Sequence, residues 1–281
     1  MEIKEINEEI LKEIYKERKR GDYKGSYGRL LIIGGSKKYS GSPALNALAA
    51  YEAGVDIVEV AAVERAANII ANFSPDIITY PLEGEFLNKK HIPILKKLAE
   101  NKDALVIGGG LGREKKIFKA VIKFLKEINI PCVVDADAIY AFAAEDIKKT
   151  NIIFTPHSYE FFILSGKEIL NLDLEEKIEI VKEEAKKRKK VILVKGNPDI
   201  ITDGERVAIN ETGNPYMTVG GTGDTLAGIL GSLIAQKNDL FLAACAAAYI
   251  NGKAGEISGK KASLVATDLL ENIGKVVDSA L

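Results

Sequence analysis

The stretch DALVIGGGLGREKKIFKAVIKFLKEINIPCVVDAD, residues 103–137, contains the pattern that decides the fold. Short apolar runs of β type, DALVIGGG (103–110) and PCVVDAD (131–137), stand on either side of a helical segment near residues 114–128. A strand, a helix and a second strand in this order are typical of two parallel strands joined by a crossover helix. The stretch therefore predicts an α/β fold.

The same alternation continues along most of the chain. Further strands are predicted at residues 30–33, 55–62, 76–82, 151–156 and 191–196, and further helices near residues 43–53, 91–101 and 173–189. Repeated alternation predicts a doubly wound, mostly parallel sheet with helices on both faces. After residue 199, the runs IITDG and RVAIN predict an antiparallel hairpin, and three helices beginning near Gly223, Leu240 and Val265 close the chain.

The first twenty residues predict a leading helix. Within residues 3–20, the isoleucines at 3, 6, 10 and 14 recur at spacings of three and four, as on one face of an amphipathic helix. A length of 281 residues is compatible with one large α/β unit. We therefore expect residues 1–281 to form a single domain.

Composition favours a small-molecule partner in the cytoplasm. Lys and Arg total 39 against 40 Asp and Glu, a balance that does not suggest a surface for nucleic acid. Cys132 and Cys245 lie in apolar stretches without metal-ligand spacing and are expected to be buried thiols in a reducing compartment. The longest apolar run, residues 240–250, is far shorter than the ~20 residues that cross a bilayer.

In a doubly wound sheet, ligands bind beyond the carboxyl ends of the strands. Candidate residues are therefore those that follow each predicted strand. They are residues 34–41, 108–112, Asp135, Asp137, residues 155–157, residues 195–199 and the loop that enters the helix at Gly223.

The strongest chemical signal is GNPYMTVGGTGDTLAGIL, residues 213–230. Glycines at 220, 221 and 223 permit a tight turn with bare N–H groups directly before an apolar helix, and such a helix start binds anions. Asp224 in the first turn is placed to take a proton from a hydroxyl beside the bound phosphate. The alternative is that Asp224 only caps the helix, which the glycines around it disfavour.

Two common nucleotide motifs do not fit. No Gly-Lys-Ser/Thr follows the glycines before Asp224, so the segment is not a Walker A loop. GGGLGR, residues 108–113, has Arg113 in place of the third glycine of the dinucleotide-binding fingerprint.

GGTGD before a helix resembles the anion-hole motif of the ribokinase-like superfamily, and GNPYM with GGTGDTLAG is similar to its NAD(P)H-hydrate dehydratase family. Further segments of the family occur in order: KGSYGRLLIIGGSKKYSGSP, IGGGLG, VVDADAI, TPHSYE and VKGNPDIIT. The resemblance covers about residues 24–275. It implies a lyase that uses ADP or ATP, with Mg²⁺, to remove water from hydrated NADH or NADPH, and releases AMP and phosphate when ADP is used.

The resemblance also implies roles for individual residues. Catalysis falls to Asp224 and to the backbone of Gly221, Thr222 and Gly223. The nucleotide is held by Lys195, Gly196, Asn197, Pro198, Asp199 and Gly223. The hydrated dinucleotide is bound by Ser42, Gly110, Gly112, His157 and Asp224.

Several of these residues have an ordinary structural alternative. Lys195 at a strand end would otherwise extend to water, and a lone histidine such as His157 is more often a surface or core residue. The family's Pro-His-Pro-Gly-Glu reads Pro-His-Ser-Tyr-Glu here, which leaves the shape of that loop open. Asp135 and Asp137 either hold Mg²⁺ through water or, for Asp137, cap the next helix. Asn251 receives no role.

Two other functions remain as alternatives. A kinase of the same superfamily acting on a vitamin precursor would use Asp224 equally well, although the Thr-Pro-His and Gly-Asn-Pro-x-Met segments resemble the dehydratase pattern. A nucleotide-binding sensor without catalysis is disfavoured by the presence of Asp224. The resemblance also implies a homotetramer, and a separate epimerase because no such domain is expected before Gly25.

Overall fold

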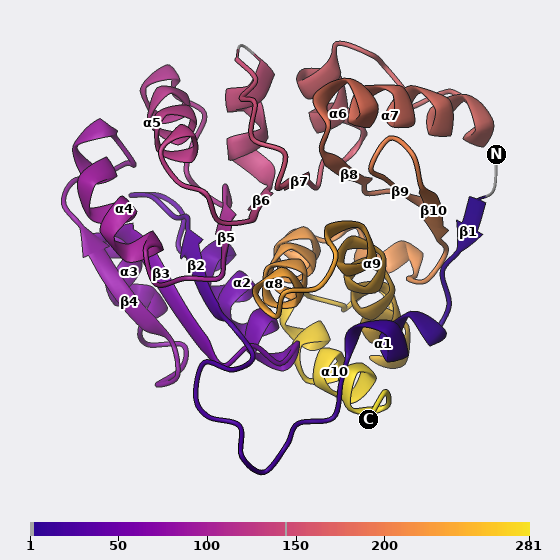
Figure 1. Cartoon of the computed structure of the whole chain (residues 1–281), viewed down its shortest axis with the longest axis horizontal. Helices are drawn as coiled ribbons and strands as arrows, with labels where there is room; N and C mark the ends of the chain where they lie inside the picture. The colour runs from indigo at the N-terminus through magenta and orange to yellow at the C-terminus, as the bar shows by residue number, and fades with distance from the viewer. Residues whose placement is uncertain (1–2, 144) are drawn as a thin grey trace.

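The computed structural model describes residues 3–143 and 145–281, and these form a single ten-stranded sheet with helices on both faces (Figure 1). The strand order is β1-β10-β9-β8-β7-β6-β5-β2-β3-β4. The strands are β1 (Ile3–Glu5), β2 (Arg29–Ile33), β3 (Ile57–Val63), β4 (Ile78–Leu82), β5 (Ala104–Ile107), β6 (Cys132–Val134), β7 (Ile152–Phe154), β8 (Val191–Val194), β9 (Asp199–Thr202) and β10 (Val207–Asn210).

The sheet is parallel except at β9, which is antiparallel to both β8 and β10. The predicted hairpin and the predicted doubly wound, mostly parallel sheet are therefore confirmed. From β2 the chain builds outward to β3 and β4, and then returns to the other side of β2 with β5. The strand order thus reverses between β2 and β5, the position at which doubly wound sheets bind ligands.

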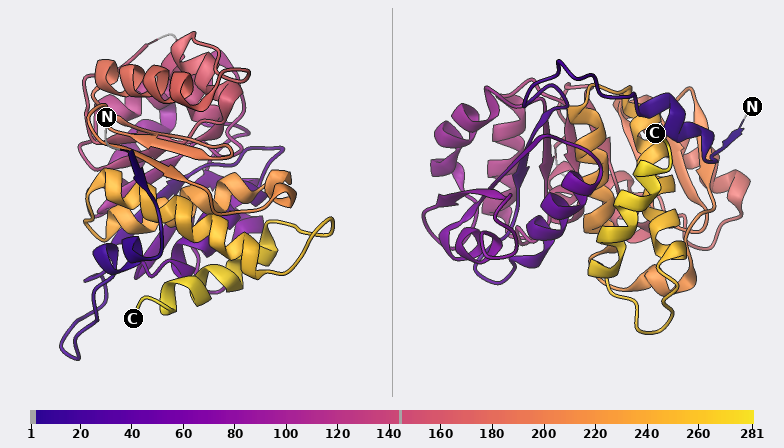
Figure 2. Two further views of the ribbon diagram at one scale, coloured as in Figure 1. Left: turned by 90° about the vertical axis from the view of Figure 1, so that its right-hand side faces the viewer. Right: turned by 90° about the horizontal axis from the view of Figure 1, so that it is seen from below.

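Helices cover the sheet in two layers, as the views in Figures 1 and 2 show. One layer contains α1 (Glu9–Ile14), α2 (Gly41–Glu52), α3 (Glu64–Ile70), α8 (Thr222–Ala235), α9 (Leu240–Ile257) and α10 (Thr267–Asp278). The other contains α4 (Ile92–Ala99), α5 (Lys115–Lys126), α6 (Ser158–Ser165) and α7 (Leu174–Arg188). Short 3₁₀ turns are η1 (Lys89–His91), η2 (Ala136–Ala143) and η3 (Pro215–Thr218).

Alternating side chains of β2 build two separate hydrophobic cores. Leu30 and Ile32 join the core under α2 and α8, whereas Leu31 and Ile33 join the core under α4 and α5. Successive side chains of a strand point to opposite faces, so a strand buried on both sides is apolar throughout. This explains the continuous apolar run that marks β2 in the sequence.

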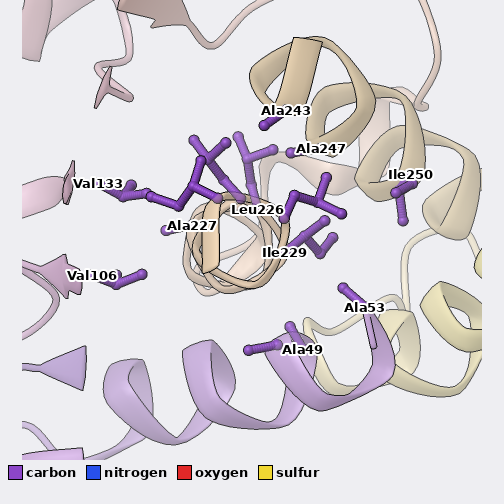
Figure 3. Packing of buried hydrophobic residues seen from close by; sticks show 14 of the residues in the cluster. Ala49, Ala53, Val106, Val133, Leu226, Ala227, Ile229, Ala243, Ala247 and Ile250 are labelled. Carbon is purple, nitrogen blue, oxygen red and sulfur yellow. The ribbon is translucent and has the colours of Figure 1, made fainter. Parts of the chain in front are cut away.

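The most deeply buried helix is α8, which lies between the sheet, α2 and α9 (Figure 3). Every residue from Thr225 to Ala235 is buried. Small residues allow this close approach: a Cβ built on Gly228 would lie 2.2 Å from the carbonyl oxygen of Asn46 in α2. The packing fixes the axis of α8 and therefore the position of its first turn.

The prediction of a leading helix over residues 3–20 is wrong in its extent. Residues 3–5 form β1, which pairs in parallel with β10, and only Glu9–Ile14 is helical. The free edge of β10 offers backbone hydrogen bonds that the isoleucine spacing does not reveal. Ile10 and Ile14 do lie on the buried face of α1, as the spacing predicts. No helix within the described ranges is long and apolar enough to cross a membrane.

Candidate functional site

The candidate site lies where the carboxyl ends of β2 and β5–β8 face the start of α8. The geometry of this edge brings loops from the whole chain together. A bridge pairs His157 after β7 with Lys195 after β8, and the amide of Gly35 after β2 donates to the carbonyl of Gly109 after β5 at 2.8 Å. The sequence expectation that these strand tips converge is confirmed.

The glycine turn before α8 adopts a backbone conformation that suits glycine. Gly221, at the N-cap of α8, has φ of +103°, and a Cβ there would lie 2.7 Å from the Cβ of Ala266 and 2.8 Å from a methyl of Leu45. The first N–H groups of a helix have no partner inside the helix, and the helix dipole adds positive potential there. The turn is therefore suited to bind an anion, as the sequence predicts.

Asp224 lies in the first turn of α8 with an altered acidity. Burial and the nearby charge of Asp135 raise its pKa to about 6, while the hydrogen bond from Ser42 and the charge of Lys195 oppose that rise. A carboxylate with such a pKa is ionised at neutral pH but binds a proton more readily than an exposed aspartate. These are the properties of a general base for a hydroxyl group.

Two side chains of α2 hold the first turn of α8. Ser42 Oγ donates a hydrogen bond to Oδ1 of Asp224, and the amide of Asn46, which is 2% exposed, donates to the carbonyl of Asp224 at 2.7 Å. Ser42 was predicted to belong to the site and the structure places it there. Asn46 was not predicted, because nothing in the sequence indicates that it packs on a helix 178 residues away.

Gly109 is the glycine of the 108–112 loop that faces Asp224. A Cβ on Gly109 would lie 1.9 Å from Ser42 Oγ and 3.2 Å from Oδ1 of Asp224. A Cβ on Gly110 would instead meet Tyr39, at 2.8 Å, and one on Gly112 would meet only apolar side chains at 3.4 Å or more. The sequence singled out Gly110 and Gly112 in this loop, but the structure places Gly109 closest to Ser42 and Asp224.

Lys195 is a cation that faces the start of α8. Its Nζ lies 3.1 Å from Oδ1 of Asp135 and 3.7 Å from Oε2 of Glu160. Burial lowers the pKa of Lys195, but these two carboxylates and Asp224 raise it above its ordinary value. A Cβ on Gly223 would lie 3.3 Å from the same amine, so Lys195 reaches the start of α8.

His157 caps α6 at the mouth of the site. Its Nδ1 accepts hydrogen bonds from the amides of Tyr159 and Glu160, at 3.1 and 3.3 Å, and half of its side chain is exposed. Because Nδ1 accepts, the neutral ring carries its proton on Nε2, which lies 3.5 Å from Oε1 of Glu160. The substitution of Ser158 and Tyr159 for Pro and Gly still leaves His157 beside Lys195.

Residues 195–199 form a loop closed by a buried carboxylate. Asp199 accepts from the amide of Gly196 at 2.9 Å and from the side chain of Asn210 at 3.0 Å, and the Asn197–Pro198 peptide is cis. Burial raises the pKa of Asp199 to about 6. Both oxygens of Asp199 are thus engaged by the protein, so the carboxylate shapes the loop.

Asp137 holds the β5 loop. Its two oxygens accept from the amide of Gly112 and from Nε of Arg113, both at 2.8 Å. Asp135 is also engaged, because Thr155 Oγ1 donates to its Oδ1 at 2.7 Å in addition to Lys195. Both oxygens of Asp137 and Oδ1 of Asp135 are thus engaged by the protein, and the described residues contain no group of three or more His, Cys, Asp or Glu side chains that could hold a metal ion. They do not fit a protein-held Mg²⁺ site.

Asn251 supports α8 from α9. Its Oδ1 accepts from Thr225 Oγ1 at 2.7 Å and its amide donates to the carbonyl of Thr222 at 3.2 Å. The sequence analysis gave Asn251 no role. The structure shows that it satisfies two buried groups in the first turn of α8.

Comparison with known proteins was made on sequence and on structure. Residues 30–275 match the family model described as NAD(P)H-hydrate dehydratase. The chain is 41% identical over 264 residues to a bifunctional NAD(P)H-hydrate repair enzyme of Pyrobaculum aerophilum, with 92% of this chain and 52% of that protein covered. It is 34% identical over 276 residues to an ADP-dependent (S)-NAD(P)H-hydrate dehydratase of Cenarchaeum symbiosum, with 97% and 96% covered.

Solved structures agree with these sequence matches. A crystal structure of the ADP/ATP-dependent NAD(P)H-hydrate dehydratase from Bacillus subtilis, co-crystallized with ATP and Mg²⁺, has a TM-score of 0.86 at 27% identity, with 100% of both chains covered. A ribokinase-like superfamily protein from Enterococcus faecalis has a TM-score of 0.89 at 22% identity, covering 99% of this chain and 96% of that one. The ribokinase-like fold is thereby confirmed. The chain spans about half the length of the bifunctional relatives.

Proposed function

Because the chain belongs to the NAD(P)H-hydrate dehydratase family, we propose that it converts hydrated NADH or NADPH back to NADH or NADPH at the expense of a nucleotide. With ADP, the products are the reduced dinucleotide, AMP and phosphate. The proposal includes ATP as an alternative donor. Overall, the water removed from the nicotinamide ring is consumed in splitting the terminal phosphate from the nucleotide, so atoms balance.

The observation that carries the proposal is the position of Asp224 beside the amide-rich start of α8. A base and an anion site in one helical turn suit the transfer of a phosphoryl group to a hydroxyl. Asp224 takes the proton of the substrate hydroxyl as that oxygen attacks the terminal phosphorus. The amides of residues 221–223 stabilise the negative charge on the transferred group.

Loss of the phosphorylated hydroxyl completes the reaction. Hydroxide is a poor leaving group, whereas phosphate departs readily as the ring nitrogen supplies its electron pair. The C–O bond breaks, and the phosphate leaves with both electrons of that bond while the ring nitrogen forms a C=N bond. The neighbouring ring carbon then loses a proton to the departing phosphate or to water, and the electrons of that C–H bond form the ring double bond again. The chain's task in this step is to hold the ring in place, which we assign to Ser42, His157 and the 108–112 loop.

We assign the nucleotide to the other half of the site. The loop of residues 195–199 and Gly223 lie on the β8 side of α8, where Lys195 provides a positive charge. Since no cluster of described residues fits a metal, Mg²⁺ belongs to the proposal as a companion of the nucleotide phosphates.

Three further parts of the proposal concern the setting of the enzyme. They are a cytoplasmic location, a homotetramer and cooperation with an epimerase that interconverts the two hydrate epimers. Light scattering of the purified chain tests the oligomeric state.

The direct test is recovery of reduced nicotinamide absorbance from hydrated NADH. Purified protein is incubated with hydrated NADH, Mg²⁺ and either ADP or ATP, with a control that lacks nucleotide. The proposal predicts absorbance that rises only with nucleotide, together with one phosphate released per NADH formed. No nucleotide-dependent recovery rejects it, and a stable phosphorylated product from a vitamin alcohol would favour the kinase alternative.

A further inference from the structure

Arg113 is held in place by two neighbours at the mouth of the site. Its Nε donates to Asp137 at 2.8 Å, and its guanidinium lies over the ring of Tyr140, 4.3 Å from the ring centroid. The side chain is nevertheless 56% exposed. We infer that Arg113 binds a phosphate group of the dinucleotide substrate, an inference that rests on the proposed function.

The guanidinium has donors to spare. An arginine side chain carries five N–H donors in a rigid fork, and among the described residues only Nε of Arg113 has a hydrogen-bond partner. A guanidinium fixed by a carboxylate and an aromatic ring loses little freedom when it binds a phosphate through its remaining N–H groups. Arg113 is therefore a preorganised hydrogen-bond donor for an anion.

The charges of the site indicate that a further cationic donor such as Arg113 is needed. Lys195 is already paired with Asp135 and Glu160. Two anionic molecules must nevertheless bind here, a nucleotide and a dinucleotide. The anion site at α8 provides for the phosphoryl group in transfer, so neither it nor Lys195 is assigned to the phosphates of the dinucleotide.

A second observation also points to a ligand. The hydroxyl oxygen of Tyr140, whose ring carries Arg113, is buried and has no hydrogen-bond partner within residues 3–143 and 145–281. A buried polar group without a partner costs free energy until water or a ligand reaches it. In this structure the hydroxyl is enclosed by protein, so Tyr140 supports Arg113 through its ring, and its unpartnered hydroxyl marks the place where water or a ligand would lower the free energy of this cluster.

The position of Arg113 selects the dinucleotide over the nucleotide. Arg113 follows β5, and Asp137, its partner, also binds the amide of Gly112 in the predicted substrate loop. The nucleotide loop follows β8, and β6 and β7 separate the two. The charge of Asp137 contributes to the raised pKa of Asp224, so this cluster belongs to the same site.

The test compares Arg113→Gln and Arg113→Lys with a matched control. Arg206 has similar local chemistry, with Nε 2.7 Å from Asp203 and the guanidinium 4.4 Å from the ring centroid of Phe241, although its Nη2 also pairs with Asp239 at 3.1 Å. It lies in the β9–β10 turn, at the opposite end of the strands from the site. Dissociation constants for NADH, NADPH and ADP are measured with the full chain, using nicotinamide fluorescence for the first two and calorimetry for ADP. KM and kcat are then measured for hydrated NADH and hydrated NADPH.

Arg113→Gln is expected to weaken dinucleotide binding about tenfold, with kcat and the ADP dissociation constant nearly unchanged. The dinucleotide dissociation constant of Arg113→Lys is expected to lie between those of the parent and Arg113→Gln, because lysine keeps the charge and loses the planar fork of N–H donors. Arg206→Gln is expected to bind the dinucleotides as tightly as the parent. Weaker binding of NADH and NADPH alike assigns Arg113 to the pyrophosphate, and weaker binding of NADPH alone assigns it to the 2′-phosphate.

Three results overturn the inference: unchanged dinucleotide binding, a loss confined to ADP, or a parent chain that binds neither dinucleotide. If dinucleotide binding depends on Arg113 but hydrated NADH is not dehydrated, the inference stands and the proposed function fails. The two are therefore tested separately.

Discussion

Ser42 Oγ donates its hydrogen bond to Oδ1 of Asp224 and so joins the first turn of α2 to the first turn of α8. The two residues are 182 positions apart in the sequence. The bond stabilises the ionised carboxylate, while burial and Asp135 favour the protonated form. The acidity of Asp224 therefore reports directly on how α2 and α8 are packed.

The first prediction concerns the pH dependence of the reaction. Asp224 must be ionised to accept a proton, and its pKa is about 6. We expect kcat/KM to fall about tenfold per pH unit below this value, whereas an ordinary aspartate would remain active to about pH 4. A pH profile of kcat/KM checks this, and a rate that stays level down to pH 5 would speak against Asp224 as the base.

Removal of the Ser42 hydroxyl should move that profile. The hydrogen bond lowers the pKa of Asp224, so its loss in Ser42→Ala raises the pKa and shifts the acid limb to higher pH. Ser40→Ala is the matched control, because Ser40 stands at the N-cap of α2 and makes no side-chain capping bond. An acid limb that Ser42→Ala leaves in place, or that both variants shift equally, would show that the bond does not tune Asp224.

Asp224 should also make stability depend on pH. Its pKa is about 6 in the folded chain against an ordinary 3.8, so the folded state binds more protons between these values. The contribution of this proton binding to the free energy of unfolding is fully present below about pH 4 and is lost as the pH rises through 6. Above pH 6, Asp224→Asn should unfold with a free energy about 3 kcal/mol higher than the parent, and the difference should vanish near pH 4.

Denaturant titrations of the parent and Asp224→Asn at several pH values measure this difference. A difference that does not change with pH would mean that the pKa of the carboxyl is the same in the folded and unfolded chains.

Asn251 should contribute to the stability of the folded chain. Asn251→Ala removes the hydrogen bonds that Asn251 makes with Thr225 Oγ1 and with the carbonyl of Thr222, but these two groups still bond each other at 2.8 Å, so the expected cost is about 1 kcal/mol of unfolding free energy. The double variant Asn251→Ala/Thr225→Val should lose less than the sum of the two single variants, because both single variants remove the bond between Thr225 and Asn251. Additive losses in the double variant would show that the two side chains act independently.

The sequence predicts the fold well because buried strands and crossover helices differ in the pattern of their apolar residues along the sequence. It fails at residues 3–8, where pairing with β10 overrides the helical spacing of the isoleucines, and at residues 15–20, which are not helical. The site is predicted wherever a residue directly follows a strand, as for Lys195 and His157, since parallel strands end at a common edge.

Contacts between helices that are distant in the sequence cannot be predicted from local sequence patterns. Asn46 and Asn251 reach the first turn of α8 from α2 and α9, and no local pattern marks either residue. Likewise, the choice among glycines in the 108–112 loop depends on backbone direction, which placed Gly109 rather than Gly110 against Ser42.

The most direct test of the central claim is the turnover of Asp224→Asn measured together with its affinity for ADP. Asparagine keeps the size of the side chain and can still accept the hydrogen bond from Ser42, but it cannot take a proton. The account predicts that Asp224→Asn binds ADP nearly as well as the parent and dehydrates hydrated NADH at least about a hundredfold more slowly. Turnover as fast as that of the parent, with nucleotide still bound, would contradict it.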